Sequence, residues 1–174
     1  TIYDSAAFPE PEQLGEIKVT SAVFSPSLDW VAPIDEKGLL RRFSLPEGDL
    51  LDSRQTALSR GALELHTDGI SLFLLSLKSL TKVDVKTGES QEVEIDRGHC
   101  MSLSAELGRI AMAHKGVRTL SLLEASDLST IVSQDDFGII TGLAFSSDGQ
   151  SLAVVSQQSL HLLEASDLSV RASS

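Results

Sequence analysis

The sequence predicts an all-β fold made of about four four-stranded antiparallel sheets, each formed by about forty residues. Two observations lead to this prediction. Residues Leu122–Ser129 and Leu162–Ser169 are the same octapeptide, LLEASDLS, set forty positions apart. Short apolar runs separated by turn-forming residues recur with the same period, which is typical of one supersecondary unit repeated along the chain.

The repeat extends beyond the octapeptide. Residues Leu63–Val85 align without a gap with Leu143–Ala165, and the alignment superimposes two Asp-Gly pairs. One apolar column holds strict register at intervals of forty residues, so the chain contains four copies of the unit. The members of this column are Leu40, Leu80, Leu120 and Leu160.

The fourth copy shows the predicted strands most clearly. Ile140–Phe145 is an apolar run that ends at a polar turn containing Asp148-Gly149, which is a hairpin signal because Gly tolerates positive φ. The second strand is predicted at Ser151–Val155. A polar turn then leads to Leu160–Ala165, and Leu168–Ser173 forms the last strand. Four short strands therefore fit in each repeat.

A helical repeat would have a similar period, but Gly-containing turns interrupt every candidate helix before about twelve residues. These turns are Glu47-Gly48, Asp68-Gly69, Thr87-Gly88 and Asp148-Gly149. Four-stranded units with a forty-residue period are typical of the blades of a β-propeller. Pro33 conflicts locally with an inner strand because it lacks an N–H, so we expect a bulge or a strand end there.

The period divides the chain into an acidic, Pro-containing N-terminal arm at residues 1–15 and four blades. We place the blades at residues 16–57, 58–97, 98–137 and 138–174.

The repeat resembles the WD40 family. Val23–Pro26 and Ala144–Gly149 are similar to the family's segment before the first turn, Gly38–Gly48 is similar to its third strand, and Gly98-His99 resembles its Gly-His pair. The resemblance implies a degenerate WD40-like propeller, because the characteristic Trp-Asp dipeptide is replaced in every copy. We therefore expect the family's Trp–Ser/Thr–His–Asp hydrogen-bond network to be missing. The replacing dipeptides are Phe43-Ser44, Val83-Asp84, Leu123-Glu124 and Leu163-Glu164.

Composition narrows the classes of function. The net charge of −11 argues against nucleic acid as a partner, and no apolar run is long enough to predict insertion into a membrane. Cys100 is the single cysteine, so no internal disulfide can form and a reducing compartment such as the cytoplasm is favoured. The apolar content is that of soluble globular proteins.

No catalytic, cofactor or metal motif occurs in the sequence. The four histidines include no pair at metal-ligand spacing, and there is no G-x-S-x-G elbow and no Gly-rich phosphate loop. We assign structural roles to His66 in a turn, His161 in a strand and His99 in a loop before an inner strand. The sequence thus favours a non-enzymatic scaffold without a cofactor. The alternative is a propeller enzyme or small-ligand binder that uses the central channel, such as a hydrolase or a lactonase-like protein.

Charge is distributed unevenly over the expected rims of the propeller. The turns between first and second strands and between third and fourth strands share one rim, which carries nine acidic residues and Lys86. We call this the acidic rim. Its acidic residues are Asp29, Glu47, Asp49, Asp68, Glu89, Glu106, Asp127, Asp148 and Asp167.

The opposite rim, here called the basic rim, is the predicted site for an acidic peptide or protein surface. It carries seven basic residues, namely Lys37, Arg54, Arg60, Lys78, Arg97, Lys115 and Arg118. Its acidic residues are Asp35, Glu36, Asp96, Asp135 and Asp136. Turn chemistry alone accounts for Asp on the acidic rim, whereas basic residues have no such preference for turns.

Four blades raise the question of how the ring closes. Rings of this type usually hold seven or eight blades, so two apolar blade faces would stay bare and would act as interaction sites. Four solutions follow from the sequence. A second copy could complete the ring, a different chain could supply blades, the repeat could belong to a longer polypeptide, or the four blades could close by themselves.

Overall fold

The computed structural model describes residues 18–56, 64–114, 116, 118–157 and 159–173. Strands and turns make up these residues, and the strands form four separate four-stranded antiparallel sheets. In chain order the strands are β1 Val19–Phe24, β2 Trp30–Asp35, β3 Leu39–Ser44, β4 Leu50–Gln55, β5 Glu64–Thr67, β6 Ser71–Leu75, β7 Ser79–Asp84, β8 Ser90–Glu94, β9 Gly98–Ser104, β10 Arg109–His114, β11 Leu120–Glu124, β12 Thr130–Gln134, β13 Ile140–Phe145, β14 Ser151–Ser156, β15 Leu160–Glu164 and β16 Val170–Ser173.

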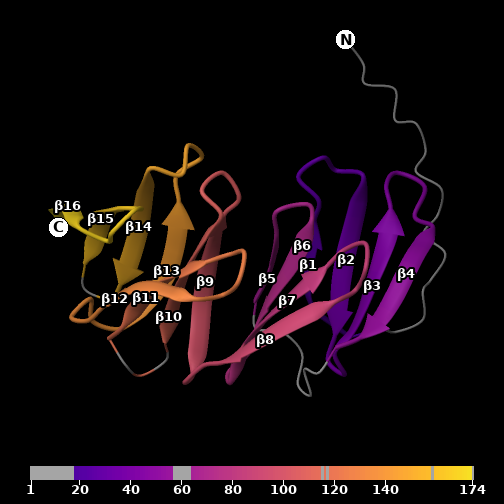
Figure 1. The fold of residues 1–174 in the computed structure, drawn as a ribbon, viewed down its shortest axis with the longest axis horizontal. Helices are drawn as coiled ribbons and strands as arrows, with labels where there is room; N and C mark the ends of the chain where they lie inside the picture. The colour runs from indigo at the N-terminus through magenta and orange to yellow at the C-terminus, as the bar shows by residue number, and fades with distance from the viewer. Residues whose placement is uncertain (1–17, 57–63, 115, 117, 158, 174) are drawn as a thin grey trace, which may run out of the picture.

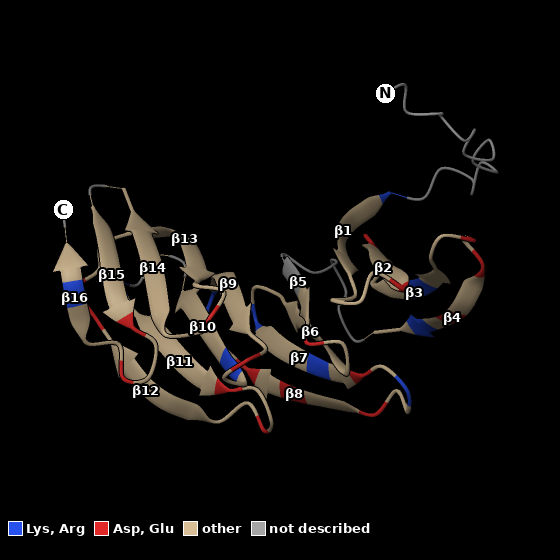
Figure 2. Cartoon of the chain, turned by 90° about the horizontal axis from the view of Figure 1, so that it is seen from above, with Lys and Arg blue, Asp and Glu red and all other residues tan. Residues whose placement is uncertain are grey.

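Each sheet is a meander of four consecutive strands, which confirms the predicted fold class of four four-stranded antiparallel blades. The blades are β1–β4, β5–β8, β9–β12 and β13–β16. The blades stand side by side in an arc, with β1, β5, β9 and β13 on its inner side (Figure 2). The first and fourth blades lie at opposite ends of the molecule's long axis (Figure 1). The four blades therefore form a partial ring and do not close on themselves.

The core lies between neighbouring blades. We call the side of a blade that looks toward the next blade in the chain its forward face, and the other side its rear face. Ile34 and Leu40 on the forward face of the first blade share a buried cluster with Leu72 and Leu74 on the rear face of the second. Equivalent clusters join the second blade to the third and the third to the fourth.

Burial along the second strand of each blade shows which faces are covered. All five residues of β6 are buried, because a blade packs on each side of it. In β14, by contrast, Leu152 and Val154 are buried on the rear face while Val155 on the forward face is exposed. The burial pattern of β2 is the reverse of that in β14, because Ala32 and Ile34 are buried on the forward face. The end blades are thus covered on one face each.

The octapeptide LLEASDLS forms the end of a third strand and the turn that follows it. Leu128 and Leu168 lie at φ 61° and 64°, in the left-handed region where blades one and two have Gly48 and Gly88. A left-handed conformation costs a Leu residue about 1–2 kcal/mol. Both leucine side chains are buried in the clusters against the preceding blade, and this burial offsets the cost.

Three local expectations were wrong. Pro33 neither ends β2 nor creates a bulge toward β3. The β2–β3 pairing lapses at Ala32 and Pro33 and resumes in the same register, because the missing N–H removes a ladder bond without displacing the chain. His66 lies within β5, where it pairs with Phe73, so it is a strand residue and not a turn residue. His99 is likewise the second residue of β9 and not part of the preceding loop.

The predicted N-terminal arm, residues 1–15, lies outside the described residues.

Candidate functional site

The loops of the basic rim are joined to one another by hydrogen bonds. The β8–β9 loop contacts the β6–β7 turn through Ile95 N–H, which donates to the carbonyl of Lys78 at 2.8 Å. His114 Nδ1 lies 2.7 Å from the Asp96 carbonyl oxygen, and this contact links the β10 end to the same loop. Further along, Gln157 N–H donates to the Ile139 carbonyl. From the second blade to the fourth, the connections therefore form one continuous edge.

Four of the seven predicted basic residues are exposed in the described connections of the basic rim, and three of them belong to this edge. Lys37 and Lys78 are exposed in the β2–β3 and β6–β7 turns. Arg97 has a positive φ of 54° in the β8–β9 loop, and its side chain is 71% exposed. Arg118 is exposed in the loop before β11. Arg60 and Lys115 lie outside the described residues.

Arg54 has a different environment from the rest of the set. It lies in β4, and its Nη2 donates to the Lys86 carbonyl in the β7–β8 turn of the next blade at 3.4 Å. Its guanidinium fills the space beside Gly88, where an added Cβ would lie 1.5 Å from Nη1. Arg54 therefore contributes to the contact between the first two blades, which the sequence pattern did not indicate.

Two acidic residues of the basic rim bond to other residues of the protein. Asp35 is buried, accepts the N–H groups of Lys37 and Leu39 at 2.9 Å, and pairs with Arg41 at 3.3 Å. Although burial opposes its ionisation, these bonds keep the pKa of Asp35 below its usual range. Asp135 accepts the Thr119 hydroxyl at 2.6 Å. Asp96, in contrast, is 84% exposed and lies 3.9 Å from the Arg97 guanidinium. Glu36 and Asp136 are exposed as well, so the exposed cations of this rim stand among exposed carboxylates.

Aspartates of the acidic rim hold the turns together. Asp68 Oδ1 accepts the N–H groups of Ile70 and Ser71 at 2.8 and 2.6 Å. Asp127 and Asp167 occupy identical turns, and each accepts the N–H of the Ser two residues later. Hydrogen bonds from the side chain and then the backbone of that Ser lower the pKa of both carboxyls. Turn formation thus accounts for these aspartates without a ligand.

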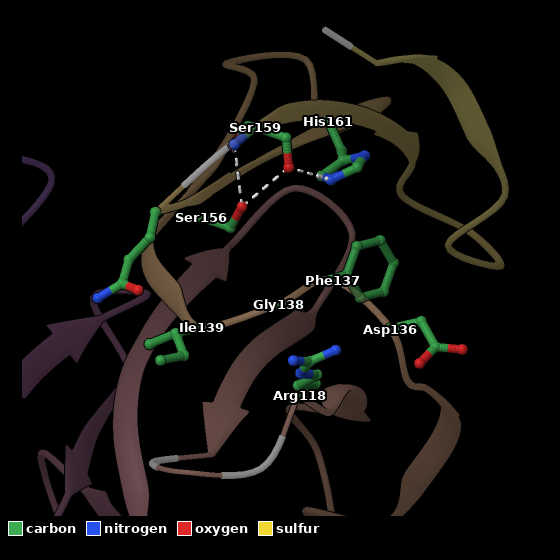
Figure 3. Close-up of a pocket in the computed structure, with 9 residues that line it drawn as sticks. Arg118, Asp136, Phe137, Gly138, Ile139, Ser156, Ser159 and His161 are labelled. Carbon is green, nitrogen blue, oxygen red and sulfur yellow. Dashed lines mark hydrogen bonds between the residues drawn. The ribbon is translucent and has the colours of Figure 1, made fainter.

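A hollow of about 310 Å³ opens between the third and fourth blades (Figure 3). The described residues that line it come from the loop before β11, the β12–β13 loop and the β14–β15 hairpin. They are Arg118, Asp136, Phe137, Gly138, Ile139, Ser156, Gln157, Ser159 and His161. Arg118, a predicted site residue, therefore borders the hollow.

A Ser–His contact lies at the upper edge of this hollow. Ser159 Oγ is 2.8 Å from His161 Nε2, and the His161 ring packs edge-on against Phe137 at 5.5 Å between centroids. Asp136 is the one carboxylate among the described lining residues, and Figure 3 shows it pointing away from His161. A nucleophile–base–acid arrangement is therefore not assembled by these residues.

The second blade explains why Ser159 is present. Ser156 and Ser159 form a turn in which their hydroxyls are 2.9 Å apart. Ser76 and Ser79 make the same turn with hydroxyls 3.0 Å apart, followed by a Thr where the fourth blade has His161. The serine pair is a turn motif of the repeat, and the histidine contact is an addition to it.

The described residues contain no cluster of three or more His, Cys, Asp or Glu side chains that could hold a metal ion. Cys100 is buried in β9. Within the same ranges, no helix is of a length and apolarity that would allow it to cross a bilayer.

Comparison with known proteins identifies the fold. No family model matches the chain, and no curated protein matches its sequence. The structure is similar to the crystal structure of the β-propeller domain of Cps50 (Swd1) of Myceliophteria thermophila, with a TM-score of 0.71 and 13% sequence identity. The fold is that of a WD40 β-propeller. The match covers 90% of this chain but only 57% of the Cps50 chain, so the four blades span little more than half of that domain.

Proposed function

We propose that this WD40-like chain is a non-enzymatic scaffold whose basic rim binds an acidic segment of another protein. The observation that carries the proposal is the exposure of Lys78, Arg97 and Arg118 on connections that share one edge, with Lys37 exposed in the equivalent turn of the first blade. Turns do not require basic residues, so the fold alone does not explain their position.

The hollow beside Arg118 would add an apolar contact to this binding surface. Phe137 and Ile139 line it together with the Ser159 and His161 side chains, and the half-exposed Ile139 side chain offers apolar area. An acidic segment with an apolar residue matches these groups, because the cations attract its carboxylates while the hollow receives the apolar side chain.

A binding measurement with a labelled Glu-rich peptide tests the rim. The double variant Lys78→Glu with Arg118→Glu should lose most of the affinity seen by fluorescence anisotropy, because two attractive contacts become repulsive. Affinity of the unmodified chain should also fall as salt rises from about 0.05 to 0.3 M, since the distance over which exposed charges attract each other shortens with salt and is about 10 Å at 0.1 M.

The matched control is Lys82→Glu with Lys86→Glu, which changes the net charge by the same amount at two lysines away from the basic rim. Lys86 is exposed in the β7–β8 turn, and the Lys82 ammonium donates to the Ser126 carbonyl in the β11–β12 turn. Affinity should change little in this control. Equal losses in the two double variants would show attraction to the whole molecule, and the rim would not be the binding site.

A further inference from the structure

The basic rim carries exposed apolar side chains at two successive blade junctions. Leu77 in the β6–β7 turn is 46% exposed, and its carbonyl accepts the N–H of Gly98 at 3.1 Å. Because Gly98 begins β9, this bond places Leu77 at the junction of the second and third blades. Ile139, which is 50% exposed, borders the hollow at the junction of the third and fourth blades. The two apolar residues therefore lie on either side of the third blade.

The turn that contains Leu77 does not require an apolar residue. Ser76 and Ser79 close this turn in the same way as Ser156 and Ser159 close its equivalent in the fourth blade. The fourth blade has Gln157 where the second has Leu77. A single exposed Leu is common on protein surfaces, so its significance depends on what surrounds it.

Cationic side chains lead from Leu77 to the hollow. Lys78 follows Leu77 in the same turn and is exposed. The β8–β9 loop, which contacts this turn, carries Arg97. Arg97 Nη1 lies 3.7 Å from the position of a Cβ added at Gly116, in the connection that also carries Arg118. The Arg97 side chain thus extends from the second junction toward the connection that borders the hollow.

The carboxylate nearest to these cations is weakly held. Asp96 lies 3.9 Å from the Arg97 guanidinium, and the two side chains are 84% and 71% exposed. Ion pairs between exposed side chains contribute little to stability. A carboxylate of a bound segment can therefore take the place of Asp96 beside Arg97.

Blade geometry limits the spacing of the groups that reach both apolar residues. Sheets that pack face to face are about 10 Å apart, so the two sides of the third blade are separated by a similar distance. An extended chain advances about 3.3 Å per residue, and side chains four residues apart lie about 13 Å apart on the same side of the chain. Two apolar side chains at this spacing would reach both junctions.

We propose that the acidic segment bound by the basic rim carries two apolar residues four positions apart, with acidic residues between them. One apolar side chain enters the hollow beside Ile139, and the other covers Leu77. The carboxylate midway between them faces Arg97. This inference rests on the proposed function, to which it adds a second apolar contact and a spacing.

Labelled Glu-rich peptides test the second contact by fluorescence anisotropy. One peptide contains Leu-Glu-Glu-Glu-Leu, and two others have Ser in place of one or the other Leu. The two-leucine peptide should bind the native chain about fivefold or more tightly than either one-leucine peptide, because a second Leu side chain leaves water. Leu77→Gln installs the residue that the fourth blade has in this turn. This variant should bind all three peptides with similar affinity.

Two controls exclude attraction to apolar groups in general. A peptide of the same composition with its two leucines adjacent should bind the native chain like the one-leucine peptides. Ile70→Gln removes a 68% exposed side chain from the acidic rim and installs the residue that the fourth blade has as Gln150. It should bind every peptide like the native chain. Equal affinity for adjacent and spaced leucines, or equal losses in Ile70→Gln and Leu77→Gln, would overturn the inference.

The double variant Lys78→Glu with Arg118→Glu separates this inference from the proposed function. It should weaken the binding of all the peptides. If it does so while Leu77→Gln binds like the native chain, the basic rim is the binding site and the second apolar contact is wrong. If neither variant weakens binding, both the proposed function and the inference are wrong.

Discussion

The third and fourth blades contain the same octapeptide and nearly the same forward face, yet one face is buried and the other is open. Leu120 and Leu122 are fully covered, whereas Leu160 and Leu162 at the equivalent positions are not. The residues of the two faces are alike, so the difference comes from the neighbour and not from the side chains. Repeat proteins bury each face against the next unit, and the last unit has no such partner in this arc.

We expect the largest effect on stability when the equivalent leucines of the two blades are truncated. Leu120→Ala should lower the free energy of unfolding by about 2–5 kcal/mol, because it leaves a cavity between two blades. Leu160→Ala should cost about 1 kcal/mol or less, since its side chain is half in water. Urea unfolding followed by circular dichroism measures both. Similar costs would mean that the face of the fourth blade is covered in solution.

Two inner-strand glycines sharpen the comparison. A Cβ added at Gly98 in β9 would lie 2.4 Å from the Ser76 carbonyl oxygen of the preceding blade, whereas one added at Gly142 in β13 would have its nearest neighbour, Val155 Cβ, at 3.9 Å. Gly98→Ala should therefore destabilise the fold by about 1–3 kcal/mol through overpacking. Gly142→Ala should stay within about 0.5 kcal/mol of the native chain. A shift in melting temperature that is equally large in both variants would contradict the open face.

We expect the smallest effect from lowering the pH, which acts on the identical turns that follow β11 and β15. Hydrogen bonds from Ser129 and Ser169 lower the folded-state pKa of Asp127 and Asp167 below the unfolded value of about 3.9. Their ionised forms therefore stabilise the fold above about pH 4, and this contribution disappears as the pH falls through the lowered folded-state pKa values. Asp127→Asn with Asp167→Asn should lose less stability than the native chain between pH 6 and about 2.5.

The pH effect is read from urea midpoints at each pH, with Glu47→Gln and Glu89→Gln as a control, since both side chains are exposed on the same rim. The control should follow the native profile. If the Asn variants did so too, these carboxylates would not stabilise the turns.

Much of the fold followed from local patterns. The period, the Gly-containing turns and the apolar runs predict strands such as Ile140–Phe145, because strands and tight turns depend on the types of neighbouring residues. His66 was misplaced because its alignment with Ser146 suggested a turn, whereas pairing with Phe73 continues the strand. Arg54 was assigned to the basic rim because nothing in its sequence neighbourhood indicates the contact with Lys86, thirty-two residues away.

The sequence alone determined the repeat, the number of blades and the Gly-containing turns, because these depend on residues close together in the chain. The tertiary structure alone decided which apolar face is covered, which cations remain exposed and where the hollow beside Arg118 opens. These features depend on which blade packs against which. Two identical octapeptides can therefore belong to one blade whose forward face is buried and to another whose forward face is open.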